Sequence, residues 1–239
     1  MRKINRLLYI LGLILFLISV IPLLQITREI VTGWLIEHQY TIHHVYTEED
    51  GFPTHIDVQE ITVNDRHIKI VEEQTGKKAN LTPFDIDEGV EAGDIVKIHL
   101  YVSGKEVTKA DEIWLSNRDI GGRYFSWLDI LKVNKQIAII QRLTDDDVEL
   151  NYSKWKIIWV DEKGDILEEK ISYQKRAKHP LAVRLITFSG TSLIPIGYHS
   201  DVLTGYPSIF FPLIYPIVTG TAGFILWISA IIYRKKHRY

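Results

Sequence analysis

The sequence has 239 residues, of which 46% are hydrophobic and 24% are charged, and its formal net charge is -2. This length is enough for one domain of ordinary size together with membrane segments. The chain contains no cysteine, which excludes disulfide bonds, cysteine-ligated zinc and a cysteine nucleophile.

The charged residues are sorted along the chain. The first 24 residues hold three basic residues and no acidic one, and the last six hold four basic residues and no acidic one. The rest of the chain holds the other 21 of the 28 basic residues and all 30 acidic ones, which gives it a net charge of -9. The sequence therefore consists of an acidic middle between two basic ends.

An apolar segment near the start of the chain predicts a first transmembrane helix at residues 7–27. These 21 residues carry no charge, and about 20 apolar residues are enough to cross a bilayer. The apolar run is longer than that of a cleaved signal peptide, and no small-x-small cleavage site follows it, so we expect an uncleaved signal-anchor. The helix is expected to continue, because four apolar residues beyond it share one helical face: Ile30, Val31, Trp34 and Leu35.

A second apolar segment predicts a transmembrane helix at residues 207–233, with Pro212 and Pro216 in its first turns, where proline disturbs a helix least. Basic residues flank both spans at the ends of the chain, so the positive-inside rule places both termini in the cytoplasm. The predicted organisation has five parts: cytoplasmic residues 1–6, span 7–27, extracytoplasmic domain 28–206, span 207–233 and cytoplasmic tail 234–239.

Alternating apolar and polar residues predict that the middle region is mainly β. Residues 96–102 alternate most regularly, and residues 137–140 are apolar on both faces, as in a central strand. Alternation at 155–159, a turn at 161–165 and a return over 166–173 predict a hairpin. Residues 181–185 are expected to form one more strand. The expected fold is an antiparallel sandwich or a barrel-like domain, with two lobes divided near residue 145 as an alternative.

No motif in the sequence carries recognisable enzymatic or metal chemistry. His38, His43 and His44 cluster without the spacing of a metal site, and residues 85–96 place Gly89 and Val96 where a calcium loop needs oxygen ligands. The only serine cluster beside glycine, residues 188–192, is expected to be a loop. We therefore predict no catalytic, cofactor-binding or metal-binding residue, and we favour a non-enzyme while leaving enzymatic activity open.

Residues 113–127 have the composition of a binding loop. Aromatic side chains supply contact area in interfaces, and arginine binds anions and carbohydrate. We predict a partner-binding surface there, although the aromatic residues of such a segment can instead fill the core while its arginines face solvent. The predicted residues are Trp114, Arg118, Arg123, Tyr124 and Trp127.

The expected function is that of a two-pass protein of the cell envelope, located in the plasma membrane. Its outer domain would serve as a non-enzymatic accessory, assembly or sensory subunit that binds a partner protein or an envelope ligand. The expected partners are the lipid bilayer and another membrane or envelope protein, and not nucleic acid. The alternatives are an extracytoplasmic carboxylate-dependent hydrolase, which would need two apposed carboxylates in a cleft, and a membrane immunity or resistance protein.

Overall fold

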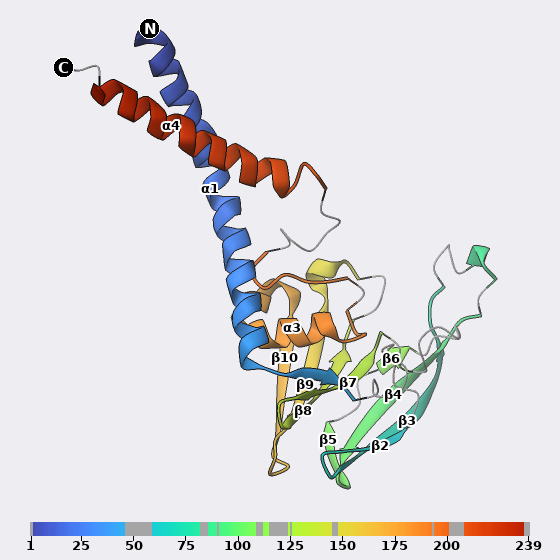
Figure 1. Cartoon of the computed structure of the whole chain (residues 1–239). Coiled ribbons are helices and arrows are strands. Elements are labelled where there is room, and N and C mark those ends of the chain that lie inside the picture. Colours follow the sequence, from blue (N-terminus) through green and yellow to red (C-terminus); the bar gives the residue numbers. More distant parts are fainter. Residues whose placement is uncertain are drawn as a thin grey trace. The chain divides into compact units, whose positions relative to one another are not determined.

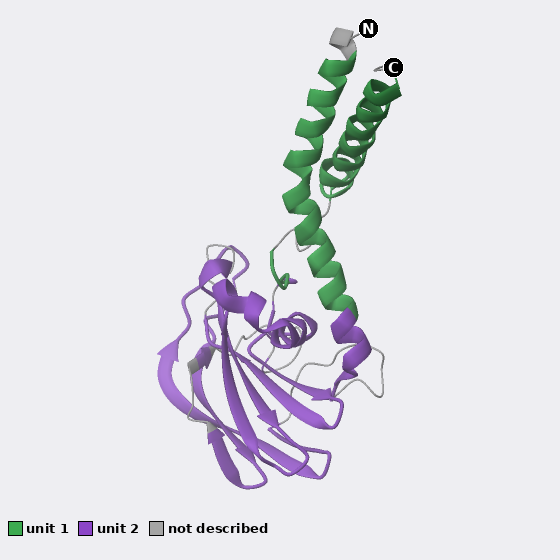
Figure 2. Ribbon diagram, turned by 90° about the vertical axis from the view of Figure 1, so that its left-hand side faces the viewer, with its two compact units in different colours: residues 1–34, 196–239 green, residues 35–195 purple. Residues whose placement is uncertain are grey.

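The structure is a computed structural model of the chain (Figure 1). It describes residues 2–45, 59–81, 86–89, 91–108, 112–114, 124, 126–144, 148–192, 194–200 and 208–236. The chain forms two compact units, coloured separately in Figure 2. Unit 1 comprises Met1–Trp34 and Ile196–Tyr239, and unit 2 comprises Leu35–Pro195.

Unit 1 is built on the two apolar helices that the sequence predicts. Helix α1 spans Arg2–Gln39, and helix α4 spans Thr219–Lys236 after a π-helical segment, η3, at Leu213–Val218. Both are long and apolar enough to cross a membrane. Helix α1 runs on past the apolar segment to Gln39, so the predicted continuation of the first helix is confirmed.

Small residues allow α1 and α4 to pack with their backbones in contact. A Cβ atom added at Gly223 would lie 2.6 Å from the Phe16 backbone nitrogen and 2.9 Å from the Gly12 carbonyl oxygen. Close to this point the Ser19 and Thr219 hydroxyl oxygens are 3.1 Å apart. Small residues with hydroxyl pairs are a common means of holding helices together in a bilayer.

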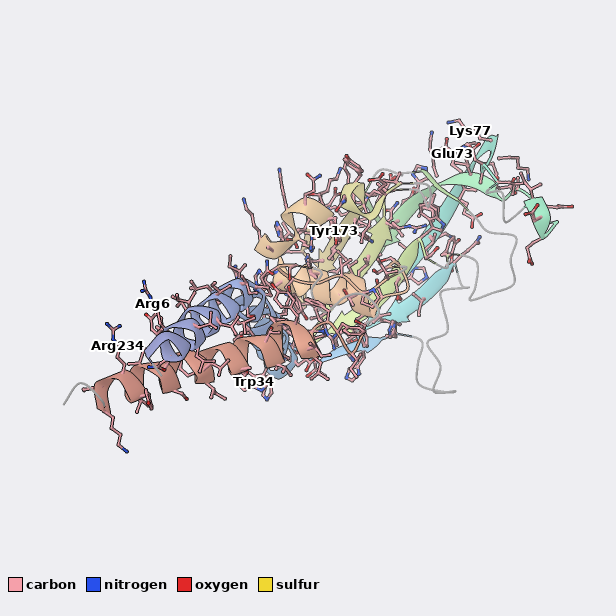
Figure 3. All side chains as sticks on the ribbon, turned by 90° about the horizontal axis from the view of Figure 1, so that it is seen from above. Arg6, Trp34, Glu73, Lys77, Tyr173 and Arg234 are labelled. Atoms are coloured by element: carbon pink, nitrogen blue, oxygen red, sulfur yellow. The ribbon has the colours of Figure 1, made fainter. Side chains whose placement is uncertain are left out.

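The two basic ends of the chain lie at the same end of unit 1. Arg6, near the start of α1, and Arg234, near the end of α4, are labelled beside each other in Figure 3. Near the same end of unit 1 the Asn5 side chain of α1 donates to the Ala230 carbonyl oxygen of α4 at 3.4 Å. The helices are therefore antiparallel, and their basic flanks face the same way.

At the other end of unit 1 a buried carboxylate joins α1 to the segment that precedes the second helix. Glu29 is only 5% exposed. Its carboxylate accepts backbone N–H bonds from Tyr198, His199 and Ser200 at 2.8, 2.8 and 2.7 Å. The chain turns so tightly here that a Cβ atom at Gly197 would overlap the Ser200 carbonyl oxygen.

Unit 2 contains two antiparallel sheets. Sheet A has the order β1 (Ile42–His44), β7 (Leu128–Val133), β8 (Gln136–Arg142), β9 (Lys154–Val160) and β10 (Ile166–Ser172). Sheet B has the order β2 (Glu60–Val63), β3 (Arg66–Lys78), β4 (Asp94–Val102) and β5 (Lys105–Thr108), and β6 (Glu112–Trp114) also pairs with β4. The mainly β expectation is confirmed, and neither sheet closes into a barrel within the described ranges.

The two sheets share one hydrophobic core. Alternate residues of β4, β7, β8 and β9 point into it, including Ile98, Ile130, Ile139 and Ile158, which are at most 1% exposed. The predicted central strand is confirmed, since Ile137 to Ile140 are all buried. The predicted hairpin is confirmed as β9 and β10, which pair antiparallel around the turn at 161–165.

The predicted strand at residues 181–185 is wrong. This segment is helix α3 (Pro180–Phe188), which follows the short 3₁₀ helices η1 (Leu150–Tyr152) and η2 (Tyr173–Lys178). Alternation of Leu181, Val183 and Leu185 also fits a helix with a wide apolar face, because Ala182 and Ile186 are buried as well. Pro180 suits the first helical position, since the missing N–H would have no partner there.

Helix α3 lies against sheet A in both Figures 1 and 2. It covers the face opposite the shared core, where Leu131, Ile140 and Ile157 are fully buried. The central strands β8 and β9 are therefore buried on both faces, whereas the edge strand β10 is largely exposed.

Candidate functional site

A pocket of about 260 Å³ lies where three hairpin turns of unit 2 meet. The turns join β2 to β3, β7 to β8 and β9 to β10, so both sheets contribute to it. We call it the hairpin pocket. Its lining residues are Asn64, Arg66, Lys132, Asn134, Lys135, Ile137, Val160, Asp161 and Glu162.

Asparagine sets the shape of two of these turns. Asn64 and Asp65 form a two-residue turn with φ of 47° and 59°, and Asn134 starts the β7–β8 turn with φ of 54°. Asparagine tolerates this left-handed backbone region better than most residues, and such turns match the twist of a hairpin. The Asn134 side chain also accepts the Thr41 backbone N–H at 2.8 Å, which fixes the turn against the start of β1.

Arg66 connects the two sheets at the pocket. Its Nη2 donates to the Glu162 carbonyl oxygen at 2.8 Å. The guanidinium group also lies against Gly164, where a Cβ atom would be 3.0 Å from Nη1. Gly164 has φ of 88°, so glycine suits this turn both for its backbone and for the space it leaves to Arg66.

The charges of the lining are unevenly paired. Glu162 forms an ion pair with Lys135 at 3.6 Å, and the Asp161 carboxylate accepts N–H bonds from its own turn. Among the described residues, no ion pair engages Lys132, which lies opposite the core residue Ile137 in the β7–β8 ladder. The lining thus carries three cationic and two anionic side chains, and among the described residues neither Lys132 nor Arg66 forms an ion pair.

No family model, curated protein or solved structure matches the chain.

The partner-binding loop predicted from sequence is only partly within the described residues. Trp114 lies in β6, opposite Ile95 of β4, and Arg118 and Arg123 fall outside the described ranges. Tyr124 is fully buried and Trp127 is 5% exposed, so both aromatic side chains belong to the shared core.

Two polar contacts hold these aromatic side chains in the core. The Tyr124 hydroxyl donates to Glu72 Oε1 at 2.6 Å, and the Arg142 guanidinium lies 4.1 Å from the centre of the Trp127 ring. A partner surface at this loop remains a prediction, carried by the two arginines and by the Trp114 side chain.

The structure also assembles a polar cluster that the sequence does not reveal. His44 Nδ1 is 3.3 Å from Asp129 Oδ2, which accepts the Gly190 N–H at 2.9 Å. The neighbouring Ser189 hydroxyl donates to the Ile186 carbonyl oxygen at 2.8 Å. The Ser189 hydroxyl is thus directed to the backbone and not to His44 in the contacts of the described residues, and Asp129 fixes the turn after α3.

The histidines that the sequence places near the first helix do not form a metal site with other described residues. Among the residues that the structure describes, no three histidine, aspartate or glutamate side chains are placed to hold a metal ion. His43 and His44 are neighbours in β1, so their side chains leave opposite faces of sheet A.

A histidine on sheet B is held between two carboxylates. His99 Nδ1 is 2.8 Å from Glu106 Oε1, and its Nε2 is 3.1 Å from Glu73 Oε2. Only the protonated ring carries N–H groups on both nitrogens. The hydrogen bond to Glu106, followed by that to Glu73, raises the pKa of His99 above its ordinary value of 6.5.

We expect His99 to give the domain a pH-dependent stability. Because the folded-state pKa is raised, its contribution is complete below about pH 6.5 and is lost as the pH rises through the raised pKa. Urea unfolding of the full chain from pH 5.5 to 9 should show this loss, and His99→Gln should remove it. A constant difference in stability between parent and variant across that range would contradict the arrangement.

Proposed function

We propose that the chain is a two-pass protein of the plasma membrane whose unit 2 lies outside the cytoplasm and binds a small ligand in the hairpin pocket. It would act as a sensory or accessory subunit and not as an enzyme. The observation that carries this proposal is the pocket itself, which opens among charged residues and has the core residues Ile137 and Val160 in its lining. Pockets with an apolar base and a few fixed polar groups are typical of ligand sites.

The surface of unit 1 supports the membrane location. Large apolar side chains on both helices are exposed, and apolar patches of this extent favour burial in lipid. Examples on α1 are Leu17, Ile21 and Leu24, at 56, 68 and 64% exposed, and on α4 Ile225 and Ile232, at 57 and 61%.

The basic ends support the orientation. Arg6 and the Arg234–Lys236 end of α4 lie together at one end of unit 1, as the positive-inside rule requires of cytoplasmic flanks. The segment that leads into and out of unit 2 leaves from the other end of unit 1, at Glu29 and residues 198–200.

Because the chain has no cysteine, single-cysteine variants test the orientation directly. A membrane-impermeant maleimide added to intact cells is expected to label Lys163→Cys, in the exposed β9–β10 turn, and to label Lys236→Cys only after permeabilisation. The cysteine-free parent is the control for background. The reverse pattern would refute the orientation.

Ligand binding is tested by native mass spectrometry of the full chain released from its own membranes. We expect a small bound mass that is lost when Lys135→Cys is modified with a bulky maleimide before release, since Lys135 is exposed at the pocket. Lys163→Cys, modified in the same way, lies outside the lining and is the matched control. A chain that carries no bound mass, or one equally retained by both modified variants, would refute binding at this pocket.

A further inference from the structure

We infer that the hairpin pocket takes a small ligand that carries a carboxylate or phosphate group, bound by Arg66 and Lys132. This inference rests on the proposed function and names the chemistry of its ligand.

Cationic side chains outnumber anionic ones in the lining of the pocket. The Glu162 carboxylate is paired with Lys135, and the Asp161 carboxylate is directed into its turn by the N–H groups of Lys163 and Asp165, at 2.9 and 2.7 Å. Three cationic and two anionic side chains give the lining a net charge of +1, and among the described residues no ion pair engages Arg66 or Lys132. An anion is the ligand that such a site attracts.

The guanidinium group of Arg66 is held in a fixed position. One of its terminal nitrogens donates to the Glu162 carbonyl oxygen, and the contact with Gly164 limits how the guanidinium plane can turn. The remaining N–H groups of the fork are available for a planar or tetrahedral anion. Arginine held in this way binds carboxylate or phosphate with little loss of side-chain freedom.

Lys132 lies on the face of β7 that points toward the shared core. Ile130 of the same strand belongs to the shared core, and alternation along β7 places Lys132 on that same face, one step nearer the turn. Lys132 therefore lines the pocket from sheet A, and Arg66 lines it from sheet B.

The size of the pocket limits the ligand. About 260 Å³ is slightly below the usual range of roughly 300 to 1,000 Å³ for drug-sized ligands, so a short organic acid or a phosphate ester fits better than a polymer. An anionic lipid headgroup offers the same chemistry, and the experiment separates the two sources.

The experiment uses the full chain in nanodiscs of phosphatidylcholine at low ionic strength. The probes are inorganic phosphate, succinate and, as a neutral analogue of similar shape, succinamide, each followed by isothermal titration calorimetry. We expect phosphate or succinate to bind and succinamide not to bind. The variant Lys132→Gln should weaken binding at least tenfold, whereas Lys163→Gln, in the neighbouring turn, should leave it unchanged.

Arg66→Gln removes the guanidinium but also its bond to the turn, so Arg66→Lys is the second variant. It keeps the charge without the fork, and we expect weaker binding with unchanged urea unfolding. For the lipid source, vesicles with phosphatidylglycerol replace the free anions. Binding to these vesicles alone, lost in Lys132→Gln, would assign the anion to a headgroup and still support the inference.

Two results would overturn the inference. One is binding of anions that is the same in Lys132→Gln and in the parent. The other is that the parent binds neither the free anions nor the phosphatidylglycerol vesicles, although its native mass spectrum shows a bound mass that is lost when Lys135→Cys is modified. The second result would retain the proposed function and reject only the anionic ligand.

Discussion

Replacing Glu29 with alanine is expected to lower the free energy of unfolding of unit 1 by about 3 kcal/mol, because it leaves three backbone N–H groups without their acceptor. Glu29 is almost fully buried, so water replaces the carboxylate poorly. Hydrogen bonds to a charged acceptor are also among the stronger ones in proteins. The measurement is unfolding of the full chain in detergent by titration with a denaturing detergent or urea.

Two further variants make the Glu29 experiment specific. Glu29→Gln keeps one acceptor oxygen in the same shape and should fall between the parent and the alanine variant. Thr27→Ala, two residues before Glu29 and on the exposed side of α1, loses only a bond to its own helix and should have little effect. Equal losses in Glu29→Ala and Thr27→Ala would show that the carboxylate does not hold the segment at 198–200.

Replacing Gly223 with alanine is expected to force α1 and α4 apart. The new methyl group would lie 2.6 Å from the Phe16 backbone nitrogen and 2.9 Å from the Gly12 carbonyl oxygen, and backbone atoms of a helix have little freedom to move. Overpacking in a close contact destabilises by about 1–3 kcal/mol. We expect a loss near the upper end of this range, since both contacts are to backbone.

Cysteine crosslinking measures the separation of the helices. In the parent, Ser19→Cys with Thr219→Cys should form a disulfide on mild oxidation, because the two hydroxyl oxygens they replace are 3.1 Å apart. After proteolysis within unit 2, the two helices should remain linked on a non-reducing gel. The same pair should crosslink much less in Gly223→Ala and normally in Thr221→Ala, which is exposed on the same helix. Undiminished crosslinking in Gly223→Ala would contradict the close contact.

Much of the fold could be predicted from sequence because its signals are local. Long uncharged runs identify the two helices, and period-two alternation identifies strands such as β4 and the β9–β10 hairpin. The same reasoning failed at α3, since Leu181, Val183 and Leu185 alternate in a strand and also fall within a wide helical face. Three residues of alternation are too few to separate the two periods, because the same three positions also fall on one wide helical face.

The hairpin pocket could not be predicted, because its parts are distant in sequence. Asn64, Lys132 and Asp161 come from three turns, and only the packing of the two sheets brings them together. The individual turns did leave a signal in the asparagines at 64 and 134, which suit two-residue hairpins. What sequence lacks is the order of strands, which decides which turns become neighbours.

The close contact of Glu29 with residues 198–200 also bears on how such a protein could be rebuilt. The chain leaves unit 1 after residue 34 and re-enters it at residue 196, and Gly33 and Tyr198 are in contact at that point, with a Cβ at Gly33 3.7 Å from the Tyr198 ring. Unit 2 is thus an insertion in unit 1, and the residues of unit 1 that flank the insertion lie close together. Any domain whose two termini lie close together can be inserted between the same two residues of unit 1. Unit 2 can therefore be exchanged for such a domain by gene fusion.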